Sequence, residues 1–192
     1  MVSSQFVLKL VNSIYTRNLK IMSTKNNQIG DRGEVVASLV LTTGYIFSCY
    51  HLGGKTPAFD LIIEISETHD SERSYQALIQ VKATESDSPF KNSGIHQGDI
   101  ITPVPKKKLH NLIKRPLPSY VMGVDINGSV HHLAPAFNPA ISYSSGIPPK
   151  LVFDTNNKDH HLAALHRLKE DIINYWESYN MHINKPRYQS IL

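Results

Sequence analysis

Hydrophobic and polar residues follow two different periods along the chain. In some segments apolar residues recur every three to four positions, as at Val36, Leu39 and Val40, which is typical of a helix with one buried face. In others they alternate, as at Leu61 and Ile63, which is typical of a half-buried strand. The patterns predict, in chain order, a helix over 31–44, strands over 45–52, 59–65 and 75–83, a helix over 106–115, strands over 119–126 and 129–133, and a helix over 159–179. Three strands before a crossing helix favour an α/β fold with a mixed sheet.

Two local signals refine this prediction. Asp31 and Glu34 form a capping-box pattern, so Glu34 is expected in the first turn of the first helix. Residues 84–104 and 134–157 show no clear period; the first is predicted to be a long loop and the second an irregular surface crossing.

Length and composition limit the class of protein. The chain has 192 residues, which predicts one domain over 28–192, preceded by an N-terminal extension over 1–27. The single cysteine, Cys49, excludes an intramolecular disulfide and a cysteine-based zinc cluster, and fits a cytoplasmic location. No apolar run approaches the roughly 18 residues of a transmembrane helix, so no membrane span is expected. The net charge of +4 permits a polyanionic partner without requiring one.

Polar residues interrupt the predicted strands at a few positions. Asp60 lies near the start of the second strand, while Gln80 and Lys82 lie two residues apart on one face of the third. Polar side chains on an apolar sheet cost free energy unless they are hydrogen-bonded or used. A carboxylate with a second oxygen ligand suits Mg²⁺, and a neighbouring lysine can orient water and stabilise charge on a phosphate. The pattern therefore favours metal-dependent hydrolysis of a phosphodiester.

These residues resemble the PD-(D/E)xK nuclease superfamily, which has the restriction-endonuclease-like fold. The matching segments are Gly30-Asp-Arg-Gly-Glu34, Phe59-Asp60-Leu-Ile-Ile and Ile79-Gln80-Val-Lys82-Ala-Thr84. The resemblance covers about residues 28–135 and is strongest to small bacterial members. It implies an α-β-β-β-α-β-β core with a mixed central sheet flanked by helices, here followed by a C-terminal helix. It also implies a Mg²⁺-dependent DNA endonuclease of bacterial defence or DNA processing, with Mn²⁺ as a substitute ion.

The same resemblance assigns the site residues. Glu34, Asp60 and Gln80 would hold the metal, and Lys82 would complete the catalytic set. Gln80 stands where the family usually has Asp or Glu, and a neutral amide should lower the affinity for Mg²⁺. The alternative is therefore a catalytically degenerate module that keeps the fold and binds DNA or a protein partner. Taken singly, Glu34 is equally well explained as a helix-capping residue.

Four lysines are candidates for contact with DNA phosphates. Lys106, Lys107 and Lys108 form a basic run on the second predicted helix, and Lys55 lies in a turn near the candidate site. A run of this kind is more often a solvated helix face. The small size of the chain slightly favours an effector that relies on a partner protein to choose its substrate, whereas nothing in the sequence indicates a homodimer interface.

Other polar residues fit a site less well. Glu64 shares a strand face with Asp60 but lies about 13 Å along the strand, too far to share one ion. His131 and His132 point to opposite faces of a strand, so they cannot bind one ion together. They and the pair His160-His161 are expected to be surface or half-buried histidines.

Overall fold

The computed structural model describes residues 25–51, 58–66, 74–94, 97–138, 141 and 146–183. Most of the N-terminal extension expected over 1–27, and Lys55, lie outside the described residues. The described helices are α2 (Lys25–Thr42), the short 3-10 helix η1 (Thr43–Tyr45), α3 (Lys106–Ile113) and α4 (Lys158–Ile183).

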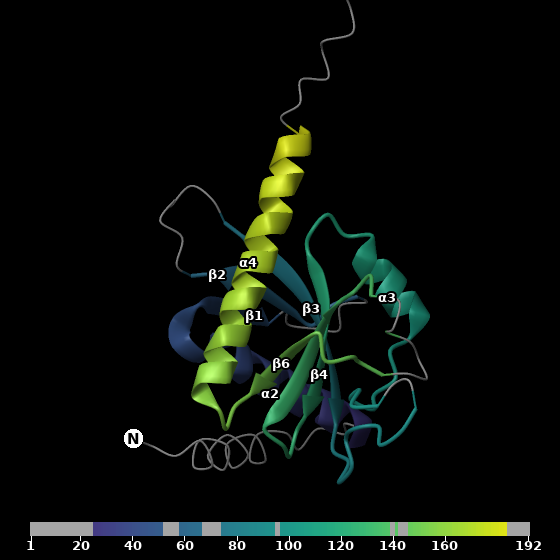
Figure 1. The fold of residues 1–192 in the computed structure, drawn as a ribbon. Helices are drawn as coiled ribbons and strands as arrows, with labels where there is room; N and C mark the ends of the chain where they lie inside the picture. Colours follow the sequence, from purple (N-terminus) through teal and green to yellow (C-terminus); the bar gives the residue numbers. More distant parts are fainter. Residues whose placement is uncertain are drawn as a thin grey trace, which may run out of the picture.

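One mixed sheet forms the centre of the molecule (Figure 1). Its strands, in both spatial and chain order, are β1 (Phe47–His51), β2 (Leu61–Ile65), β3 (Gln76–Thr84), β4 (Ser119–Asp125), β5 (Val130–Pro135) and β6 (Leu151–Asp154). β3 and β4 pair in parallel, and the other neighbouring strands pair antiparallel. The parallel pair requires a crossover between its strands, and α3 lies in that crossover. The α/β class with a mixed sheet is thus confirmed.

The two faces of the sheet are covered differently. Alternate residues of β3, such as Ile79, face the larger apolar cluster, which also takes in buried residues of α2 and α4. Leu78 faces the opposite way, into a smaller cluster with Leu112 of α3. Because side chains alternate along a strand, Gln80 and Lys82 lie on the α3 face of β3.

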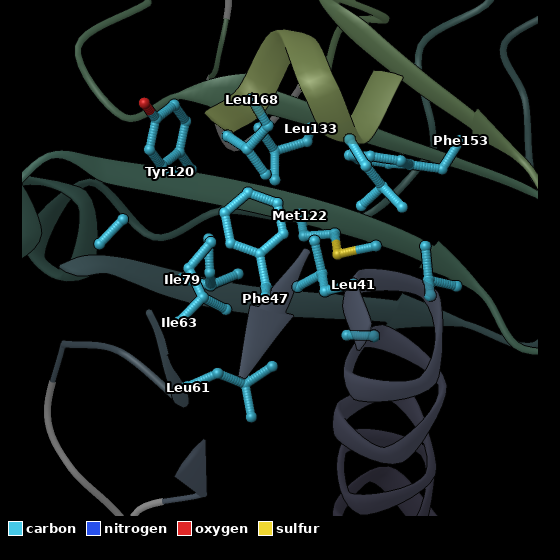
Figure 2. Packing of buried hydrophobic residues seen from close by; sticks show 14 of the residues in the cluster. Leu41, Phe47, Leu61, Ile63, Ile79, Tyr120, Met122, Leu133, Phe153 and Leu168 are labelled. Carbon is cyan, nitrogen blue, oxygen red and sulfur yellow. The ribbon is translucent and has the colours of Figure 1, made fainter. Parts of the chain in front are cut away.

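The larger cluster is the main hydrophobic core of the protein. Figure 2 shows Phe47 of β1 beside Met122 of β4, with Leu133 and Leu168 packed above them. All four side chains are at most 2% exposed. Removing this much apolar surface from water is the main source of folding free energy, and it fixes α2 and α4 against the sheet.

The first helix begins earlier than predicted. α2 starts at Lys25, so Asp31 is an interior residue and the expected capping box is wrong. Ile29 packs against the main core, and this contact extends the helix toward its N-terminus. Glu34 consequently lies near the middle of α2 rather than in its first turn.

The irregular crossing predicted over 134–157 contains a strand. β6 pairs antiparallel with β5 at one edge of the sheet, opposite the edge formed by β1. Its Phe153 is fully buried in the main core and makes an edge-to-face contact with His161 of α4. Four residues give too short an alternation to recognise in sequence, and burial beneath α4 is what fixes the strand. Among the described residues, no helix combines the length and apolarity that a bilayer crossing requires.

Candidate functional site

The candidate site forms where β2 and β3 separate. β2 begins at Leu61, which pairs with Ile79, whereas β3 continues to Thr84. At the point of separation, the Asp60 amide donates to the Ile79 carbonyl at 2.9 Å. The Asp60 carboxylate then accepts a hydrogen bond from the Val81 amide at 2.7 Å. Asp60 therefore satisfies a β3 backbone donor that lies just past the last β2–β3 pair, which holds its side chain at the split between the strands.

Gln80 is buried directly against Asp60. Its side chain is 2% exposed, and its Nε2 atom donates to Asp60 Oδ2 and, at 3.3 Å, to the Val81 carbonyl. Its Oε1 atom is buried without a hydrogen-bond partner among the described residues. A buried amide oxygen with no partner costs free energy, so the Gln80 amide carries an unused acceptor in this arrangement.

The oxygen atoms around Gln80 are of the types that a hard cation binds. Nε2 lies within hydrogen-bond distance of two oxygen atoms, from Asp60 and from the Val81 backbone. Turning the amide over exchanges Nε2 for the unpartnered Oε1 and would bring three oxygen atoms together. Carboxylate, amide and carbonyl oxygens are the ligands that Mg²⁺ takes. The residues present therefore fit a divalent cation, although the described residues contain no group of three or more His, Cys, Asp or Glu side chains that could hold a metal.

Glu34 reaches the same region because α2 crosses very close to β3. A Cβ atom at Gly33 would overlap the Cβ of Ala83, so only glycine permits this approach. Arg32, one residue earlier, forms an ion pair with Glu85 just past the end of β3, with an N–O distance of 2.6 Å. These two contacts hold Glu34 beside Asp60.

The site perturbs the ionisation of its own residues. Burial, then the charges of Asp60 and Asp31, raise the pKa of Glu34 to about 7. Burial also raises the pKa of Asp60, although the Val81 amide and Lys82 oppose that shift. The two carboxylates thus resist being charged together, as expected of two half-buried acidic groups placed side by side.

Two lysines supply positive charge at the same place. Burial, followed by the charge of Lys108, lowers the pKa of Lys82, whereas Asp60 and Glu34 raise it. Lys108 lies on α3, and its charge also acts on both carboxylates. The structure thus groups Lys108 with the site, while Lys106 and Lys107 are exposed on the surface of α3. In the sequence the three lysines form a single run, and helix phase alone does not show which of them faces the sheet.

Glu64 and the paired histidines, which the sequence analysis also considered, do not belong to the candidate site. Glu64 of β2 lies at an exposed position, where it accepts hydrogen bonds from Tyr50 of β1, at 2.9 Å, and from Ser74. His131, His132 and His161 are 1–4% exposed, so the expectation that they are surface or half-buried histidines is wrong for these three. The Nδ1 atom of His131 is buried without a hydrogen-bond partner among the described residues. His132 lies near the Ile147 carbonyl and His161 near the Val40 carbonyl.

Comparison of the chain with protein-family models, curated proteins and solved structures yields no match.

Proposed function

We propose that this protein is a metal-dependent endonuclease that hydrolyses phosphodiester bonds in DNA. The observation that carries the proposal is the meeting of Glu34, Asp60, Gln80 and Lys82, which come from α2, the start of β2 and β3. Carboxylates, an amide oxygen and a lysine at one place are the groups that hydrolysis of a phosphodiester needs.

The order of elements supports the same assignment. A helix, three strands, a crossing helix and further strands follow one another as expected for the restriction-endonuclease-like fold. Within that order, the acidic residue directly precedes the second strand and the Gln-x-Lys motif lies in the third. Neither the order nor the motif is specific alone; the proposal rests on their coincidence with the contacts between the side chains.

Each residue has a distinct part in the proposed reaction. Asp60, Gln80 and the Val81 carbonyl would hold a Mg²⁺ or Mn²⁺ ion, with Glu34 as a further ligand. The ion would acidify a bound water and offset the negative charge of the phosphate. Lys82 donates hydrogen bonds to the attacking water or to a phosphate oxygen, since its ammonium group lies beside Asp60 and Glu34. The Glu34 carboxylate, beside the ion, can take up the proton that the attacking water loses as it bonds to phosphorus, and the leaving oxygen takes a proton from solvent when its own bond to phosphorus breaks.

A second function, a DNA- or partner-binding module without catalysis, is favoured by one observation. The Gln80 amide nitrogen donates a hydrogen bond to Asp60, so it occupies a carboxylate oxygen that would otherwise be open to a metal. A neutral amide also supplies no charge to retain the ion. In this case the protein would bind DNA through α3 and leave it intact.

Incubation of the full chain with supercoiled plasmid tests the proposal. We expect nicked or linear product with Mg²⁺ or Mn²⁺ and none with EDTA. Asp60→Asn and Lys82→Met should each abolish cleavage, the first through loss of the ion and the second through loss of stabilisation at the phosphate. Gln80→Glu should tighten Mg²⁺ and keep or raise activity.

Matched surface variants control this experiment. Asp159→Asn and Lys158→Met change exposed residues in the first turn of α4 and should cleave like the wild type. Wild-type protein that binds DNA but remains inert with every divalent ion would support the binding module instead. Cleavage that survives Asp60→Asn would refute the site itself.

A further inference from the structure

A groove separate from the candidate site lies between the end of α3, the start of β4 and the C-terminal half of α4. Its volume is about 500 Å³, within the range of small-molecule and cofactor sites. Phe137, Tyr175 and Tyr179 line it and are 76%, 37% and 37% exposed. Large aromatic side chains gathered on one concave surface and left in contact with water are a feature of binding sites.

The tyrosine rings of the groove are held in a fixed arrangement. Tyr175 and Tyr179 are one helical turn apart on α4, and their planes lie within 8° of parallel. Trp176 packs edge-to-face against both, at 6.0 and 5.9 Å between ring centroids. Its indole nitrogen donates to the Gln76 carbonyl at 2.9 Å, which anchors the set to β3. The two rings therefore offer parallel faces on which a flat ligand can stack with little further ordering.

One cation lines the groove, and two more line a hollow beside it. Arg115 lines the groove at the α3 end. A smaller adjoining hollow shares Tyr120, Pro135 and Asp171 with the groove and is lined by Lys150 and Arg167. Asp171 lines both the groove and the hollow, and its carboxylate accepts a hydrogen bond from the buried Tyr120 hydroxyl at 2.6 Å. The rim therefore favours an anionic ligand, and it disfavours a second copy of this chain, which would bring the same cations face to face.

We propose that this groove holds an unpaired nucleobase, stacked on Tyr175 and Tyr179, with its phosphate on Arg115. This inference rests on the proposed function and names its substrate as DNA with an unpaired stretch. Both places adjoin α3, which carries Lys108 at the candidate site and ends at Ile113 beside the groove, about 8 Å farther along the helix axis. A strand whose phosphate lies at Lys82 could thus reach the groove within a few nucleotides.

Stacking on aromatic rings explains why single-stranded ligands are favoured. A base in a duplex has both faces covered by its neighbours, whereas an unpaired base can exchange one neighbour for a tyrosine ring. Asn174 lies on the same wall and offers an amide to the edge of the base. The arrangement does not distinguish a nucleotide in a strand from a free mononucleotide, since base and phosphate are common to both.

Binding in EDTA tests the groove apart from catalysis. The probe is a short fluorescein-labelled oligothymidine, measured by anisotropy, together with the emission of Trp176, the only tryptophan in the chain. We expect the oligomer to bind more tightly than the duplex of the same length and to quench Trp176. Tyr179→Leu should weaken binding by roughly five- to a hundredfold, and Arg115→Gln should flatten its salt dependence by about one phosphate contact.

Two control variants match these changes. Tyr45→Leu removes an 86% exposed tyrosine outside the groove, and Lys158→Gln removes an exposed cation at the other end of α4. Both should bind the oligomer like the wild type. Thymidine monophosphate that displaces the oligomer at equal concentration would show that the groove takes a free nucleotide and would overturn the strand assignment.

Other outcomes separate the two proposals. Equal affinity for duplex and single strand, with no change in Trp176 emission, would overturn the groove proposal and leave the nuclease proposal intact. A dimer in sedimentation that Tyr179→Leu dissociates would assign the groove to a second copy and also overturn it. Stacking in EDTA without cleavage in Mg²⁺ would keep the groove and refute the nuclease.

Discussion

The two faces of β3 show how one strand serves both stability and chemistry. Ile79 and Val81 on the first face belong to the main core, where apolar contacts from α2 and α4 cover them. Gln80 and Lys82 on the second face place an unpartnered amide oxygen and a half-buried ammonium group beside two carboxylates. The first face lowers the free energy of the fold, whereas the second raises it. A protein keeps such a costly arrangement mainly where it is used.

Breaking each face in turn should separate stability from activity. Phe153→Ala on the core side should lower the free energy of unfolding by about 3–5 kcal/mol, because it leaves a cavity beneath α4. Lys82→Met keeps the stem and removes a charge that burial disfavours, so the melting temperature should stay or rise while plasmid cleavage is lost. Thermal denaturation followed by circular dichroism measures both. A large loss of stability in Lys82→Met would contradict the division between the faces.

His131 is a polar exception on the core face. Burial, then the charges of His161 and His132, lower its pKa to about 4, with Asp154 opposing the shift. Its folded pKa lies below the unfolded value, so the stabilising effect of a neutral ring is complete above pH 6.5. This stabilisation is lost as the pH falls toward 4, and the loss reaches about 3 kcal/mol. Urea denaturation across this range should show the loss, and His131→Leu should remove about that much of it. The exposed His160→Leu variant should follow the wild-type curve.

Two glycines of α2 compare open space with close packing. A Cβ at Gly30 meets nothing within 4 Å, so Gly30→Ala should stabilise the helix by about 0.5–1 kcal/mol. Gly33→Ala would force α2 away from Ala83 and should cost about 1–3 kcal/mol. The same shift would move Glu34, so Gly33→Ala should also weaken Mg²⁺ binding while Gly30→Ala leaves it unchanged. Equal effects of the two variants would show that the approach of α2 to β3 does not position the site.

The smallest expected effect concerns the proton on Glu34. Because its pKa is about 7, roughly half of the molecules carry this proton at pH 7, and a bound cation should displace it. Mg²⁺ titration calorimetry in buffers of different ionisation enthalpy should report release of about half a proton at pH 7 and almost none at pH 9. Glu34→Gln should release none at either pH. A release that persists in this variant would assign the proton to another group.

The sequence by itself determined the α/β class and most of the element positions. Long alternating or helical periods, as in β3 and α4, predict the element correctly because burial of the same apolar face is what stabilises it. It also singled out Asp60, Gln80 and Lys82, since polar residues on an apolar strand stand out without any knowledge of their partners. The sequence did not predict the strand β6 or the true start of α2, because both depend on contacts that Phe153 and Ile29 make with distant segments.

Only the tertiary structure decided which of these residues meet. It joined Glu34 to the site through the close passage of Gly33 over Ala83, and it selected Lys108 from three adjacent lysines. It also placed the end of α3 beside the tyrosines of α4 to form the aromatic groove. The physical reason is the same in each case. A period along the chain reports which face of an element is buried, while the distance between two side chains depends on how whole elements pack, and that is set by contacts far apart in the sequence.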